Sequence, residues 1–108
     1  MKYLVRATQG PSFTSVDAMI PVLEKIVLPG LEVLRDLEAK KTILAGGLPV
    51  GERGLAFIIE APSNEELDDM LQKIPLWGLL TWDVTPLQSF KGRADYERAF
   101  AAKIKRGM

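Results

Sequence analysis

Four polar residues lie in segments with strand-like sequence, and their types suit proton-transfer chemistry. Glu60 and Asp83 are carboxylates, and a carboxylate can remove a proton from an acidic C–H group. Arg6 carries a fork of N–H donors that matches a carboxylate, which makes it a candidate anchor for an anionic substrate. Tyr3 adds a hydroxyl that can donate a proton. We therefore take Glu60 and Asp83 as candidate catalytic residues, and Arg6 and Tyr3 as candidate substrate-binding residues.

The amino-acid composition excludes several other kinds of chemistry. The chain has 108 residues and contains neither Cys nor His, which removes disulfides, thiolate nucleophiles, histidine-based triads and zinc sites with Cys or His ligands. Lys plus Arg and Asp plus Glu number 14 each, so the zero net charge favours neither nucleic acid nor an anionic membrane as a partner. We expect no cofactor and no metal. Neither a signal peptide nor a membrane-spanning run is visible, so a cytoplasmic location is expected.

The strands that would hold these residues are marked by β-branched and aromatic residues between turn signals. The segments that read as strands are residues 2–8, 42–45, 55–61 and 79–85. In the last of them, alternation places Asp83 and Trp82 on opposite faces, so these two side chains should not line the same space.

Two helices separate the predicted strands. The first should begin at Thr14 or Ser15 and be broken or bent near Pro29-Gly30, because proline lacks a backbone N–H. The second begins with a capping box at Ser63 and carries apolar residues at helical spacing.

The resulting order, β-α-β-β-α-β, is that of the ferredoxin-like α+β fold, with four antiparallel strands in the spatial order 4-1-3-2. The first strand then lies between the fourth and the third, so Arg6 is expected beside both Asp83 and Glu60. Both helices cover one face of the sheet. We expect a second copy of the chain to cover the other face, because the apolar segment 55–61 argues for burial on both sides.

Residues 1–90 are therefore expected to form one domain, with residues 91–108 as a helical tail. The tail has six basic and two acidic residues. The interruption of its positive charge by acids argues against a nucleic-acid-binding arm. Tyr96, Phe100 and Ile104 recur every four residues and form a narrow apolar stripe. This stripe predicts that the tail packs on its own domain or on a partner.

Residues 63–90 resemble the muconolactone isomerase family. The resemblance rests on Ser63 at the start of a helix, on the turn Ile74-Pro75-Leu76-Trp77, and on the pair Asp83-Val84 in the last strand. It implies a dimeric α+β barrel, often assembled into larger rings, and hence a homodimer or larger homo-oligomer. It also implies isomerisation of a small lactone by proton transfer without metal or organic cofactor.

Three functions remain open on this basis. The first is a cofactor-independent isomerase acting on a small lactone or carboxylate metabolite. The second is a non-catalytic small-ligand-binding or assembly module, and the third is a cofactor-free oxygenase of the same barrel superfamily. A solvent-reachable pocket shared by Arg6 and an acid would favour an enzyme. A sealed, apolar sheet face would favour the assembly module.

Overall fold

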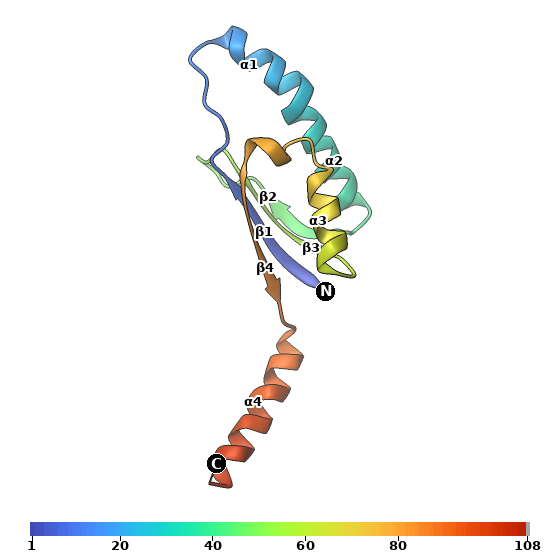
Figure 1. Ribbon diagram of the computed structural model, residues 1–108, viewed down its shortest axis with the longest axis vertical. Coiled ribbons are helices and arrows are strands. Elements are labelled where there is room, and N and C mark those ends of the chain that lie inside the picture. Colours follow the sequence, from blue (N-terminus) through green and yellow to red (C-terminus); the bar gives the residue numbers. More distant parts are fainter. Residues whose placement is uncertain (108) are drawn as a thin grey trace.

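The structure, a computed structural model, describes residues 1–107 (Figure 1). Its strands are β1 (Lys2–Thr8), β2 (Ile43–Gly47), β3 (Leu55–Glu60) and β4 (Thr81–Leu87). Its helical segments are α1 (Val16–Val22), the π-helical turn η1 (Leu23–Val27), α2 (Leu28–Ala39), α3 (Asn64–Gln72), the 3₁₀ turn η2 (Trp77–Leu79) and α4 (Phe90–Lys105). Each strand predicted from the sequence is present, with boundaries that differ by up to two residues.

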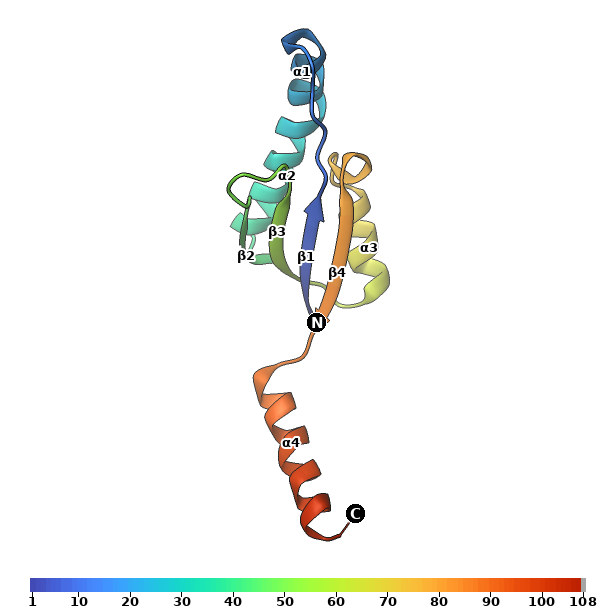
Figure 2. The same ribbon diagram turned by 90° about the vertical axis from the view of Figure 1, so that its left-hand side faces the viewer.

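The four strands form one sheet in the order β2-β3-β1-β4, and all neighbours are antiparallel. Read from the other edge, this is the order 4-1-3-2, which confirms the predicted ferredoxin-like α+β fold. Both α2 and α3 lie on one side of the sheet (Figure 1). The opposite face of the sheet is bare, and Figure 2 turns that face toward the viewer.

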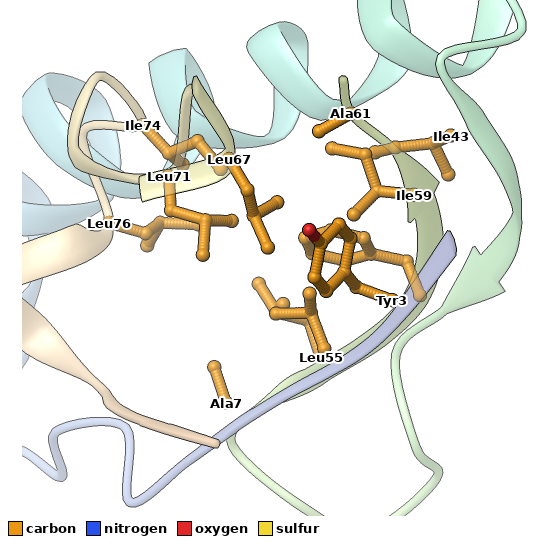
Figure 3. Packing of buried hydrophobic residues seen from close by; sticks show 12 residues of the cluster. Tyr3, Ala7, Ile43, Leu55, Ile59, Ala61, Leu67, Leu71, Ile74 and Leu76 are labelled. Atoms are coloured by element: carbon orange, nitrogen blue, oxygen red, sulfur yellow. The ribbon is translucent and has the colours of Figure 1, made fainter. Parts of the chain in front are cut away.

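The core lies between the sheet and these helices (Figure 3). Alternation along β1 buries Tyr3, Val5 and Ala7 and leaves Arg6 on the bare face, because successive side chains of a strand point to opposite sides. The helix α3 contributes Leu67 and Leu71 from its apolar face. Its cap is the predicted one, since the Ser63 Oγ accepts a hydrogen bond from the Glu66 N–H at 3.1 Å.

The first long helix differs from its prediction. The helix continues through Pro29 and Gly30 as part of α2, and its irregular turn lies earlier, at η1. In that turn the Leu28 N–H donates to the Leu23 carbonyl oxygen, five residues back. Pro29 is the second residue of α2 and directly follows the π-turn, where the regular hydrogen-bond pattern of the helix is already interrupted. Gly30 permits close packing, since a Cβ there would lie 2.6 Å from Leu76 Cγ.

The C-terminal helix α4 stands away from the rest of the chain (Figures 1 and 2). Its direction stretches the molecule to 69 × 28 × 22 Å, and the radius of gyration is 18.7 Å. A compact domain of this length would have a radius of gyration of about 13 Å. The tail therefore does not pack on its own domain, and its packing on a partner stays a prediction. No helix within residues 1–107 is long and apolar enough to cross a membrane.

Candidate functional site

Two of the predicted site residues meet on the bare face of the sheet. Arg6 of β1 lies directly opposite Asp83 of β4, as the predicted strand order requires. Asp83 and Trp82 point to opposite faces, because Trp82 pairs with the buried Ala7. Arg6 enters none of the ion pairs shorter than 4.0 Å that join residues of the described chain. Arg6 and Asp83 are therefore cross-strand neighbours that do not form a salt bridge.

Glu60 lies on the same face but apart from Arg6. The register of β1 and β3 places Glu60 opposite Lys2, whereas Arg6 pairs with Ala56. Lys2 and Arg6 are four residues apart on one strand, a separation of about 13 Å. The expectation that Arg6 neighbours both acids is therefore met only for Asp83. Glu60 instead lines a shallow hollow with Lys41.

Tyr3 lies on the opposite face of the sheet from these charged residues. Its side chain is 1% exposed, and its hydroxyl donates a hydrogen bond to Asn64 Oδ1 at 2.6 Å. Asn64 is the first residue of α3, so this bond ties β1 to the start of that helix. The substrate-binding role of Tyr3 stays a prediction. The burial of its side chain argues against that role.

Replacing Tyr3 by Phe tests these two roles. Because the change removes one hydrogen bond and keeps the ring, we expect the free energy of unfolding to fall by about 1 kcal/mol. Turnover of any substrate should remain unchanged. Urea unfolding followed by tryptophan fluorescence measures the first quantity. If Tyr3→Phe lost turnover while its free energy of unfolding stayed unchanged, a role of Tyr3 in substrate binding would be supported.

A mostly apolar cavity lies at one end of the sheet, between η1 and the loops that follow β1 and precede β3. Its volume is about 520 Å³, within the range of small-molecule sites. The four hollows described for residues 1–107 are lined by none of the residues Arg6, Asp83 and Tyr3. The lining is mostly aliphatic and consists of Gly10, Pro11, Ser12, Phe13, Met19, Leu23, Val27, Leu31, Leu48, Glu52, Arg53, Gly54, Leu55, Leu76, Leu79 and Leu80.

Arg53 and Glu52 are the charged residues of this lining. The Arg53 Nε donates to the Gly10 carbonyl oxygen at 3.0 Å, and the Gly10 N–H donates to the Arg53 carbonyl oxygen at 2.8 Å. This reciprocal pair joins the end of β1 to the β2–β3 loop. It also fixes the stem of Arg53, while the terminal nitrogens form no hydrogen bond or ion pair within residues 1–107.

Gly10 is required for this approach. A Cβ at Gly10 would lie 2.6 Å from the Arg53 carbonyl oxygen and 2.8 Å from Arg53 Cβ, distances that real Cβ atoms do not adopt. The opposite wall is shaped by η1, which contributes Leu23 and Val27. Single π-turns inside α-helices are frequent at functional sites. The arrangement can hold an apolar ring beside one cation and one carboxylate.

The sequence analysis did not identify Glu52 and Arg53, because they lie in a loop rather than in a strand. The signal that was available is glycine placement: Gly10 and Gly54 flank the point where the two loops touch. Within residues 1–107, no group of three or more acidic side chains forms a potential metal site.

Comparison with known proteins gives the family. The family model of muconolactone delta-isomerase matches residues 1–92. The chain belongs to this family. Among curated proteins none matches the sequence significantly.

Two solved structures have a similar fold. Muconolactone isomerase, solved at 3.3 Å, has a TM-score of 0.67 and 21% identity, covering 82% of this chain and 90% of that chain. The 5-chloro-2-hydroxyhydroquinone dehydrochlorinase of Burkholderia phenoliruptrix AC1100, in complex with 2,5-dihydroxybenzoquinone, has a TM-score of 0.60 and 23% identity. It covers 85% of this chain and 98% of that chain. At these sequence identities the two structures show that the fold is shared.

Proposed function

We propose that this protein is a small-molecule isomerase of the muconolactone delta-isomerase family, acting by proton transfer on a small lactone or carboxylate metabolite. The observation that carries the proposal is the apolar cavity with Arg53 and Glu52 in its lining. Membership of the muconolactone delta-isomerase family supports the proposed reaction class. The cavity supplies what such a reaction needs: apolar walls, an anchor for an anion and a carboxylate base.

In the proposed reaction Arg53 binds the carboxylate of the substrate, and the ring lies between Leu23 and Leu76. The Glu52 carboxylate removes a proton from a carbon that is conjugated with the lactone carbonyl through the ring double bond. The electron pair of that C–H bond moves into the conjugated system, and the proton returns at another carbon. Substrate and product have the same formula, so no oxidant, reductant or second substrate is consumed.

A turnover experiment in D₂O tests the function. We expect a muconolactone incubated with the protein to isomerise and to incorporate deuterium at the protonated carbon, as observed by ¹H NMR. A boiled sample is the control for spontaneous exchange. Binding without isomerisation or exchange would instead identify a non-catalytic ligand-binding module. Absence of both binding and turnover would remove muconolactones from consideration.

We also propose that the bare face of the sheet is covered by a second copy of the chain. The side chains of Leu4, Ala56 and Ile58 on this face are half-buried, and the charged pairs Lys2–Glu60 and Arg6–Asp83 border them. An apolar centre with a charged rim is the usual anatomy of an interface. On this proposal Arg6 and Asp83 contribute to self-association, and the reaction takes place in the cavity.

A further inference from the structure

The helix α4 carries an apolar stripe that nothing within residues 1–107 covers. Tyr96, Phe100 and Ile104 are 59%, 40% and 56% exposed. Tyr96 and Phe100 stack with their ring centroids 6.3 Å apart. An isolated helix of this length is marginally stable in water, and in proteins most helical stability comes from packing of the apolar face. The family match ends at residue 92, so nearly all of α4 lies outside the matched part.

A second uncovered stripe lies at the other end of the molecule. Val16, Ile20 and Leu23 follow one another along α1 and into η1 and are between 38% and 64% exposed. This stripe is about 10 Å long and the stripe of α4 is about 12 Å long. Two helical stripes of similar length can pack ridge into groove over their whole extent.

The arrangement of the two helices in space favours contact between copies. α1 and α4 project from opposite ends of the sheet (Figure 1), so they cannot meet within one chain. A two-fold axis that is parallel to the bare face and perpendicular to the long axis stacks a second copy on that face and reverses it end for end. It therefore places α4 of each copy at the end where α1 of the other lies, in a closed and symmetric arrangement.

The charges beside the two stripes are complementary. Residues 91–108 carry four more basic than acidic side chains. Lys103 and Lys105, near the end of α4, take part in no ion pair within residues 1–107. The segment that carries the stripe of α1 has two acidic residues, Asp17 and Glu24, and one basic residue, Lys25. Opposite charges at the rim orient two surfaces toward each other.

We propose that α4 is an arm that packs its stripe on the stripe of α1 in a second copy of this chain. The proposal rests on the self-association proposed above but names a different contact. The arm reaches past the sheet of its partner to the helix that carries the wall of the partner's cavity, since Met19 and Leu23 belong both to this segment and to the cavity lining.

Size-exclusion chromatography with light scattering measures the contribution of the arm. We expect Phe100→Glu to weaken self-association by at least about tenfold. The matched control is Ala102→Glu, about 200° further round the same helix. It should leave the mass unchanged. Equal masses for wild type and Phe100→Glu over the whole dilution range would overturn the proposal.

Cross-linking tests which helices are in contact. The chain has no native cysteine, so only the introduced thiols can react. Ile20→Cys and Phe100→Cys chains carrying different tags are co-expressed and treated with a short bis-maleimide. We expect a mixed-tag dimer, and none when Ala102→Cys replaces Phe100→Cys.

Cross-linking of Phe100→Cys with itself would show that arms pair with arms and would overturn the proposal. An oligomer that persists without any Ile20–Phe100 cross-link also overturns it, while the proposed sheet contact then stands. Loss of the oligomer in Ile58→Glu tests the sheet contact separately.

Discussion

Replacing Arg53 by Gln is expected to lower kcat/KM by about 30- to 100-fold, mainly through a higher KM. The Arg53 Nε donates to the Gly10 carbonyl oxygen, and Arg53 is part of the cavity lining. Loss of one partner of a charged, hydrogen-bonded pair costs about 2–5 kcal/mol. We place the effect toward the lower end of that range, because Arg53 is exposed in the free protein and solvent screens exposed pairs.

Arg6→Gln is the matched control for this prediction. Both changes replace an exposed arginine by the same uncharged residue, but Arg6 lies on the bare face opposite Asp83. Steady-state rates of both variants should be measured at a protein concentration where each keeps the wild-type mass. The opposite ranking, with Arg6→Gln impaired and Arg53→Gln active, would move the reaction to the bare face. Comparison of a substrate with its neutral ester then tests the carboxylate anchor, since Arg53→Gln should bind the two with similar affinity.

The local elements of this fold were readable from the sequence because short-range physics fixes them. The cap at Ser63 and the alternation that separates Asp83 from Trp82 depend on neighbouring residues only. The continuity of the helix at Pro29 was not readable in the same way. It depends on the position of Pro29 within the first turn of α2 and on the π-turn before it.

The site was less predictable, because its geometry depends on contacts between segments far apart in sequence. No hairpin loop joins β1 to β3, so nothing local fixes their register, and Glu60 pairs with Lys2 instead of approaching Arg6. Arg53 reaches the cavity only because the loop after β1 passes close enough for Gly10 to bond its backbone. A sequence pattern identifies a turn-rich loop there. It does not say which distant segment the loop will touch.

The core that supports this cavity is small, and we expect Ile59→Ala to remove about 2–5 kcal/mol from the free energy of unfolding. Ile59 lies on β3 and is fully buried. It pairs with Tyr3 on one side and with Ile43 on the other, so the cavity left by its side chain cannot collapse without moving two neighbouring strands. A domain of this size has a net stability of about 5–15 kcal/mol. The variant should therefore approach the threshold of folding at 37 °C.

Graded substitution separates the loss of packing from a general disturbance of the strand. Ile59→Val deletes one methylene group and is expected to cost about 0.5–1.5 kcal/mol. Val50→Ala removes branched apolar atoms from a fully exposed loop residue, and its effect should lie within about 0.5 kcal/mol of zero. Urea unfolding at fixed protein concentration gives the free energy of unfolding of all three variants. The slope of each transition shows whether their unfolded states are comparable. Equal losses for Ile59→Ala and Val50→Ala would contradict the placement of the core on this face. A loss that grows from Ile59→Val to Ile59→Ala would support that placement, and Leu55 on the same buried face of β3 connects this core to the cavity that it lines.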